Sequence, residues 1–221
     1  LMIGENCDLA IESTMIYHTP KVKEMIQDLG IPVIVDCSSY EPHPLGRTEW
    51  IRLYAALVGK EAEADAFMSQ QGALINFEDT GKTVAFFYIN TDGSVVIRKP
   101  TDYIAKVISL AGGHYVYEHL ADDDRASSVS SVTMENFYAT AADADLLIYN
   151  AAIVSPISSV DELIAKDSLF ADFKAVQEGN VWCTGKSYFQ ATDAVADMIR
   201  DIHTAMVGGD ESTMSFFYRV S

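Results

Sequence analysis

The chain has 221 residues, of which 49% are hydrophobic and 21% charged, and its formal net charge at pH 7 is −17. This length and composition predict a globular protein with a sizeable core, and the acidic balance argues against nucleic acid as a partner because phosphates would be repelled. Cys7, Cys37 and Cys183 show neither a CxxC nor a zinc-ligand spacing, so they predict no disulfide framework and no metal centre.

The first elements read as a strand, a helix and a second strand. Residues 8–12 form a short apolar run, and residues 19–30 have a helical pattern that Thr19 can cap and Gly30 can end. A second apolar strand is expected over 31–36. Short connections between these elements are typical of a βαβ unit with a parallel sheet.

A long helical pattern follows the loop at 38–47. It opens at Thr48 and continues to about residue 76, with an apolar stripe along one side. A helix of this length would extend on the order of 40 Å, which is enough to bridge two lobes. The predicted organisation is therefore a partial N-terminal α/β lobe over 1–47, a bridging helix over 48–76 and a C-terminal α/β lobe over 77–221.

The second half repeats the alternation of strands and helices. Strands are expected at 83–89 and 95–97, on either side of a turn, and again at 145–150 and 181–183. Helices are expected at 101–113, after Thr133, after Ser159 and over about 192–207. The predicted fold class is α/β: two Rossmann-like α/β lobes joined by one long helix, the first lobe being incomplete.

Candidate ligand-binding residues follow from the rule that open α/β sheets bind ligands at the carboxyl ends of their strands. Cations and aromatic side chains at such positions would suit an anionic or planar ligand, while a solvated basic loop is the alternative of about equal weight for the pair at 98–99. The candidates by this rule are Tyr17, His18, Arg98, Lys99, Tyr103, Lys186 and Tyr188, and Arg47 is a further candidate at the turn into the long helix.

No motif for covalent catalysis is present. The sequence contains no GxGxxG, P-loop, GxSxG or HExxH pattern, and no two histidines have helical spacing for a metal. Enzymatic activity therefore has no positive support among these patterns, and a solute receptor is the first hypothesis only through the family resemblance given below. A Rossmann-like enzyme of the transferase type and a lobe that serves only protein contacts remain alternatives.

Several strings resemble a known family. CDLAIES followed by KVKEMIQDLGIPVIVD, the segment GRTEWIRLYAALVGKEAEADAF, and AKVISLAGG are similar to the first lobe, the bridging-helix entry and the second-lobe opening of one group of proteins. These are the extracytoplasmic substrate-binding proteins of ABC importers for iron chelates, haem and cobalamin. The resemblance covers nearly the whole chain, although the family's leading strand and helix do not precede Leu1.

The resemblance implies a function for the chain. It would deliver an iron chelate, as a ferric siderophore or haem with cobalamin as the next choice, to ABC permease subunits, and it would need no cofactor. VTMENFYATAADADLLIY resembles the segment whose glutamate docks on the permease, which assigns that role to Glu135. The family also implies an extracytoplasmic, lipid-anchored location, with the anchor outside this chain.

Overall fold

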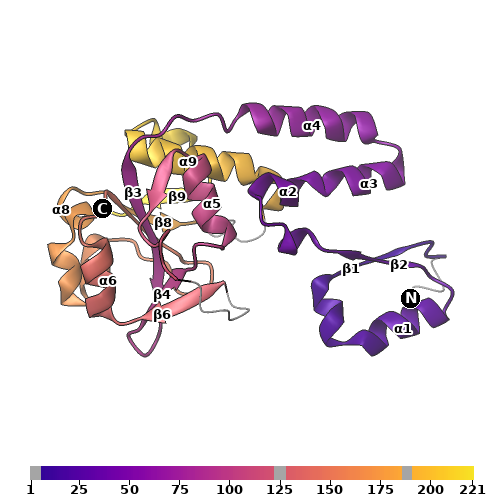
Figure 1. Ribbon diagram of the computed structural model, residues 1–221, viewed down its shortest axis with the longest axis horizontal. Helices are drawn as coiled ribbons and strands as arrows, with labels where there is room; N and C mark the ends of the chain where they lie inside the picture. Colours follow the sequence, from indigo (N-terminus) through magenta and orange to yellow (C-terminus); the bar gives the residue numbers. More distant parts are fainter. Residues whose placement is uncertain (1–5, 122–127, 186–190) are drawn as a thin grey trace.

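The computed structural model describes residues 6–121, 128–185 and 191–221, and Figure 1 shows them as two α/β lobes connected by helices. Within these residues, no helix combines the length and the apolar character that crossing a bilayer would require.

The first lobe contains the predicted βαβ unit. Strand β1 (Ala10–Ser13) and strand β2 (Val33–Asp36) pair in parallel, with Ala10 opposite Val33, and helix α1 (Pro20–Asp28) connects them. A 3₁₀ helix, η1 (Thr14–His18), leads from β1 into α1, and Pro20 occupies the first turn of α1. The prediction of a parallel βαβ unit is confirmed.

The connection between the lobes is not one continuous helix. The prediction of a single helix over 48–76 is therefore wrong. Helix α2 (Pro44–Glu49) begins four residues earlier than predicted, and it is followed by α3 (Ile51–Val58) and α4 (Glu61–Ala73). Gly59 ends α3 in the left-handed conformation, with φ of +68°, and the amide of Lys60 donates to the carbonyl of Ala55. The chain therefore reverses, and α4 runs back beside α3 (Figure 1).

The second lobe is built on a mixed sheet with the strand order β6-β4-β3-β7-β8-β9, and β5 pairs with β3 beside β4. Strands β5 and β7 pair in parallel with β3, and β8 pairs in parallel with β7. Strand β4 pairs antiparallel with β3, and β9 pairs antiparallel with β8. The strands are β3 (Lys82–Ile89), β4 (Val95–Arg98), β5 (Gly113–Tyr115), β6 (Val129–Val132), β7 (Leu146–Tyr149), β8 (Val181–Thr184) and β9 (Phe217–Arg219).

Helices cover both faces of this sheet. Figure 1 shows α6 and α8 on one side and α5 and α9 on the other. The α-helices of the lobe are α5 (Tyr103–Leu110), α6 (Met134–Ala141), α7 (Val160–Ile164), α8 (Lys174–Gln177) and α9 (Val195–Val207). Further 3₁₀ helices are η2 (Ser38–Tyr40), η3 (Ser168–Asp172), η4 (Thr192–Ala194) and η5 (Glu211–Thr213). The predicted alternation is confirmed, whereas β5, β6 and β9 were not expected from the sequence.

The main hydrophobic core lies in the second lobe. Strands β7 and β8 are buried along their whole length, as expected for the centre of a sheet covered on both faces. Phe137 of α6 packs among aromatic rings of the sheet and of the segment after α7. The core of the first lobe is small by comparison and consists of Ala10, Ile26 and Ile31.

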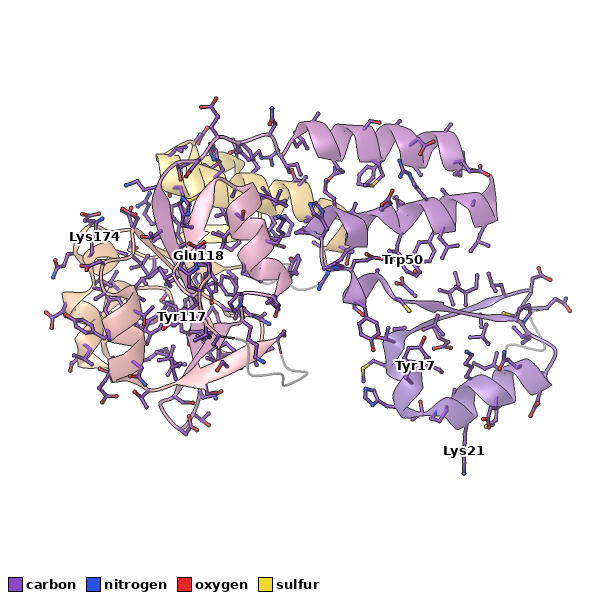
Figure 2. All side chains as sticks on the ribbon, in the orientation of Figure 1. Tyr17, Lys21, Trp50, Tyr117, Glu118 and Lys174 are labelled. Carbon is purple, nitrogen blue, oxygen red and sulfur yellow. The ribbon has the colours of Figure 1, made fainter. Side chains whose placement is uncertain are left out.

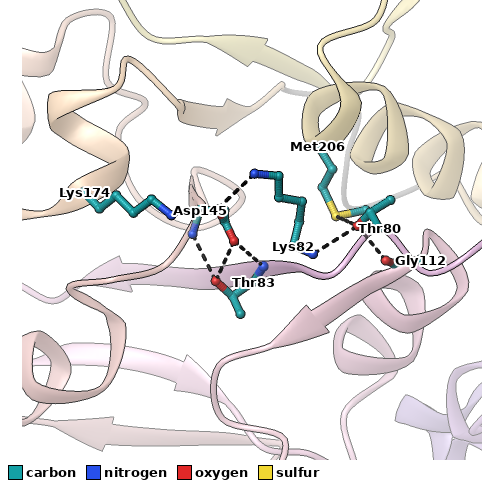
Figure 3. A network of polar contacts seen from close by, with 7 residues as sticks. All are labelled: Thr80, Lys82, Thr83, Gly112, Asp145, Lys174 and Met206. Carbon is teal, nitrogen blue, oxygen red and sulfur yellow. Dashed lines mark hydrogen bonds and ion pairs between the residues drawn. The ribbon is translucent and has the colours of Figure 1, made fainter.

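A polar cluster joins the starts of β3 and β7 (Figure 3). The Asp145 carboxylate accepts hydrogen bonds from the ammonium groups of Lys82 at 3.1 Å and Lys174 at 2.9 Å, and from the amide and hydroxyl of Thr83 at 2.9 and 3.1 Å. Burial alone would raise the pKa of Asp145, but Lys174, Thr83 and Lys82 outweigh it and hold the pKa well below its usual range.

We expect Asp145→Asn to lower the free energy of unfolding by about 2 kcal/mol at pH 7, since two cations would lose their shared anion. Because the folded pKa is depressed, the carboxylate stabilises the fold above the unfolded pKa of about 4, and that contribution is lost as the pH falls toward the folded pKa. Urea unfolding at pH 7 and pH 3 measures the difference, which should shrink at pH 3. Asp143→Asn, at an exposed position two residues earlier, is the control.

Candidate functional site

A cavity of about 380 Å³ lies between the first part of the chain and the second lobe. It is open on one side and has a mixed polar and apolar lining. The residues come from the segment after β2, from α2, from the end of β4, from the position before β6, and from the amino ends of α5 and α9. They are Ser38, Ser39, Arg47, Arg98, Asp102, Tyr103, Ile104, Ser128, Ala191, Thr192 and Val195.

Arg47 connects the two sides of this cavity. It lies in α2, yet its guanidinium carbon is 4.1 Å from the centroid of the Tyr103 ring in the second lobe. Its Nε donates to the carbonyl of Glu41 at 3.4 Å and its Nη2 to the carbonyl of Ser39 at 3.2 Å. These contacts hold the guanidinium in place through main-chain oxygens and an aromatic face, without using a carboxylate.

The start of α5 positions the residues on the second-lobe side of the cavity. The Asp102 carboxylate caps this helix by accepting from the amide of Ile104 at 2.8 Å, and it lies 3.7 Å from the Arg98 guanidinium. Tyr115 fixes the main chain of Arg98, since its hydroxyl accepts from the Arg98 amide and donates to the Arg98 carbonyl. Burial raises the pKa of Tyr103 to about 12, so its phenol is neutral at physiological pH.

Helix α2 is attached to the second lobe beside the cavity. The hydroxyl of Thr48, which is buried, donates to the carbonyl of Thr192 in η4 at 2.8 Å. A smaller cavity of about 220 Å³ adjoins the first one and shares Ser38, Arg47 and Thr192 with it. Trp50 also lines this smaller cavity, and its indole donates to the Glu41 carboxylate at 3.1 Å.

Three of the predicted ligand-binding residues meet in the larger cavity: Arg47, Arg98 and Tyr103. Lys99 does not line it, because its side chain is buried in the second lobe with 3% exposure. Whether Lys99 contributes to binding stays a prediction.

Tyr17 and His18 do not line this cavity. They are exposed in η1, which connects β1 to α1, and the Tyr17 hydroxyl lies 3.9 Å from the sulfur of Cys37, the residue before the lining Ser38. Figure 2 shows Tyr17 on the first lobe and Trp50 where α2 meets α3. Lys186 and Tyr188 fall outside the described residues. Whether Tyr17 and His18 contribute to binding stays a prediction.

Some lining residues were not predicted. Ser38 and Ser39 follow β2 at its carboxyl end, so the rule that selected Tyr17 and His18 could have found them. Asp102 could have been recognised as the cap of α5, one residue after the predicted start at Thr101. Thr192 and Val195 had no sequence signal, because their position depends on how α9 packs against α2.

A second surface feature surrounds Glu135. This residue is exposed in the first turn of α6, whose cap Thr133 accepts from the amide of Asn136 at 3.3 Å. The residue's own main-chain amide, then Thr133, lower the pKa of Glu135, so the carboxylate is ionised at neutral pH. A groove of about 480 Å³ beside it includes two further acids, Asp92 and Asp167.

No set of three or more His, Cys, Asp or Glu side chains is placed to hold a metal ion in the part of the chain that the structure describes. The cavity instead offers guanidinium groups, hydroxyl groups and an aromatic ring. Its chemistry is therefore suited to binding a solute through charge, hydrogen bonds and stacking.

Comparison with known proteins shows the fold. No family model matches the chain. Two uncharacterized lipoproteins of Methanocaldococcus jannaschii are 24% and 26% identical to it over 92% and 90% of its residues, and the chain spans about half the length of these relatives.

Solved structures resemble it at lower identity. A possible iron-binding periplasmic solute-binding protein of Staphylococcus epidermidis superimposes with a TM-score of 0.71 at 13% identity, over 93% of this chain and 78% of that one. A periplasmic haem-binding protein of Vibrio cholerae gives 0.71 at 17%, over 90% and 77%. A periplasmic vitamin B12-binding protein of the same organism gives 0.59 at 15%, over 90% and 74%. The family resemblance predicted from the sequence is thus confirmed in the fold, which is that of two-lobed periplasmic binding proteins.

Proposed function

We propose that this chain is the solute-binding receptor of an ABC importer and binds an iron chelate, either a ferric siderophore or haem, with cobalamin as the next candidate. The observation that carries the proposal is the cavity lined by Arg47, Arg98 and Tyr103, which lies between two lobes of a periplasmic binding-protein fold. The solved relatives are named for iron, haem and vitamin B12 binding, which supports this range of ligands.

The same comparison supports a proposal for the location of the protein. We propose an extracytoplasmic position, held at the membrane by a lipid anchor. The periplasmic neighbours and the two lipoprotein relatives support both parts of this proposal. The solved neighbours are binding proteins, which supports a receptor rather than the transferase-type enzyme.

Tryptophan fluorescence tests the ligand class, because Trp50 lines the smaller cavity beside Arg47. We would titrate the chain with ferric siderophores, haem and cobalamin, with iron-free siderophores as controls, and confirm each affinity by calorimetry. Saturable quenching at micromolar concentration or below is expected for one class. Trp50→Phe should reduce the quenching while calorimetric binding persists. If no compound of the panel binds, the proposed function is wrong.

We further propose that Glu135 docks on a basic site of the permease. An exposed carboxylate in the first turn of α6 is stabilised by the helix dipole and is free to meet a cationic partner. Glu135→Gln should reduce the ligand-stimulated ATPase activity of the cognate importer in proteoliposomes by about tenfold, because the charge attraction is lost. Ligand affinity of the receptor should not change.

The matched control for docking is Glu61→Gln, because Glu61 is an exposed acid in the first turn of another helix, α4. It should leave ATPase stimulation within about twofold of the unsubstituted protein, as expected for a surface charge outside the contact. Equal losses for Glu135→Gln and Glu61→Gln would contradict a specific role for Glu135 and indicate a general effect of net charge.

A further inference from the structure

The first lobe and the helix beside it leave apolar surface exposed. Among the described residues, nine of the twelve exposed large hydrophobic side chains lie from Ile11 to Val58, in the first lobe, η2 or α3. The second lobe, which holds the main core, contributes Ile153, Val207 and Tyr218. Exposed apolar surface that gathers in one part of a protein marks an interaction site. The arrangement of β1 and its neighbours indicates what binds there.

A groove of about 920 Å³ lies between β1 and the helices α3 and α4. Leu9 and Ile11 line its first-lobe wall, and the apolar residues of the opposite wall include Ile51, Ala55 and Val58. Ile11 is 39% exposed and Val58 is 71% exposed. Two apolar walls that face water across such a groove are stabilised by any apolar element that removes this water.

The apolar face of α1 is wider than the part of it that the first sheet covers. Ile26 packs against Ala10 in the small core of the first lobe. Val22, Met25 and Leu29 lie at helical spacing beside Ile26, yet they are 44%, 66% and 51% exposed. Figure 1 shows the sheet of β1 and β2 between α1 and α3. A wider sheet in this position would cover more of α1 and close part of the groove.

Strand β1 has an open edge. Among the described strands, β1 pairs with β2 alone. The amide of Ala10 donates to the carbonyl of Pro32, on the β2 side, at 2.9 Å. Because main-chain groups alternate in direction along a strand, the amide and carbonyl of Ile11 point to the other side. An added strand can bond to these two groups, whereas a lipid chain in the groove would leave them without a main-chain partner.

We propose that a second copy of this chain pairs antiparallel with the open edge of β1, about a two-fold axis at Ile11. The dimer joins two sheets of two strands into one sheet of four, and its interface is the same patch on both copies. In this register Ile11 lies opposite Ile11 of the second copy, and the two residues exchange both of their main-chain hydrogen bonds. Assembly through this edge does not depend on the ligand of the cavity.

Charge favours this register. Each copy has a net charge of −17, so carboxylates that faced each other across the new strand pair would oppose association. With Ile11 at the axis, Glu12 of one copy lies opposite Ala10 of the other. Ser13 in turn lies opposite Leu9. No carboxylate of β1 therefore faces another, and the dimer adds apolar side chains beside Ile11 and the groove.

Sedimentation equilibrium of the full chain measures the association. A reversible equilibrium between monomer and dimer is expected, with a Kd of about 1 to 100 μM for a short strand pair with apolar surroundings. Raising NaCl from about 50 to about 500 mM should tighten the dimer, because salt screens the repulsion between two acidic copies. A dimer that weakened with salt would contradict an interface formed between like-charged copies.

Substitutions at the axis test the register. Ile11→Lys and Ile11→Glu each place two like charges opposite one another, so each should weaken the dimer by about tenfold or more. An equimolar mixture of the two variants should dimerise again, because an ammonium group then faces a carboxylate. Val207→Lys is the matched control, since Val207 is an exposed apolar residue at the end of α9 in the second lobe. Its Kd should stay within about twofold of that of the unsubstituted protein.

Amide hydrogen exchange measured by NMR tests the unsubstituted protein. The Ile11 amide should exchange more slowly as the protein concentration rises through the Kd, because only the dimer supplies its hydrogen-bond partner. The Ala10 amide is the internal control, since its bond to Pro32 lies within one copy and its protection should change little with concentration. Circular dichroism shows whether each variant is folded.

Three results would overturn the proposed dimer. A chain that stays monomeric up to about 200 μM, above the expected Kd, does not pair through this edge. A dimer that Ile11→Lys leaves intact, or that mixing the two variants fails to restore, uses another surface or register. A monomer that floats with phosphatidylcholine vesicles would instead identify lipid as the cover of the groove. Ligand binding in the cavity is tested separately and stands or falls independently of these results.

Discussion

Phe137→Ala is expected to lower the free energy of unfolding by about 3–5 kcal/mol, the range found when a buried phenylalanine is truncated in a core. Phe137 is fully buried, and its ring centroid lies 4.6 Å from that of Phe87, 5.6 Å from Phe173 and 6.2 Å from Phe170. The substitution would remove the ring that joins α6 to β3 and to the segment after α7, and the rigid neighbours could close the cavity only in part.

Urea unfolding followed by circular dichroism measures this loss, with Asn136→Ala as the control on the same helix. Asn136 is exposed, so its substitution should stay within about 0.5 kcal/mol of the unsubstituted protein. A loss below about 1 kcal/mol for Phe137→Ala would show that the aromatic cluster is not packed as described. Helix α6 also carries Glu135. ATPase stimulation by the Phe137→Ala variant should therefore fall only under conditions in which the variant unfolds.

Gly112→Ala is the second large effect, and we expect it to cost about 3 kcal/mol or more. Gly112 has φ of +83°, and an added Cβ would lie 2.2 Å from the carbonyl oxygen of Glu78. The carbonyl of Gly112 also accepts the amide and hydroxyl of Thr80 at 2.8 and 2.7 Å, so the strand entry into β3 would have to move (Figure 3). Strain and steric contact act together at this residue.

Gly179→Ala separates these two causes. Gly179 has φ of +70°, but a Cβ there would meet no atom within 4 Å. It should therefore cost only the conformational strain of about 1 kcal/mol. Thermal melts of both variants provide the comparison, and equal losses at the two positions would show that the contact with Glu78 relaxes freely.

Local sequence signals determined most of the secondary structure. Caps and helix ends are set by residues next to one another, which is why Thr133 and Ser159 begin α6 and α7 as predicted and why the apolar runs became β3, β7 and β8. The same kind of signal is present at Gly59, whose left-handed conformation ends α3 within the apolar stripe that predicts one long helix.

The short strands β5, β6 and β9 depended on pairing partners far away in the chain. Each has three or four residues, too few for an alternation pattern to identify it, and each is stabilised by an existing neighbour in the sheet. Local propensity contributes little to such strands because their hydrogen bonds come from the partner.

The sequence by itself therefore determined the α/β class, the parallel βαβ unit and the chemical nature of Arg47, Arg98 and Tyr103 as candidates. Only the tertiary structure decided which candidates meet. Arg47 reaches Tyr103 because α2 is attached to the second lobe through Thr48, whereas Tyr17 and His18 do not line the cavity. Residues far apart in sequence meet only when helices pack, and packing depends on the shapes of whole faces and not on any local pattern.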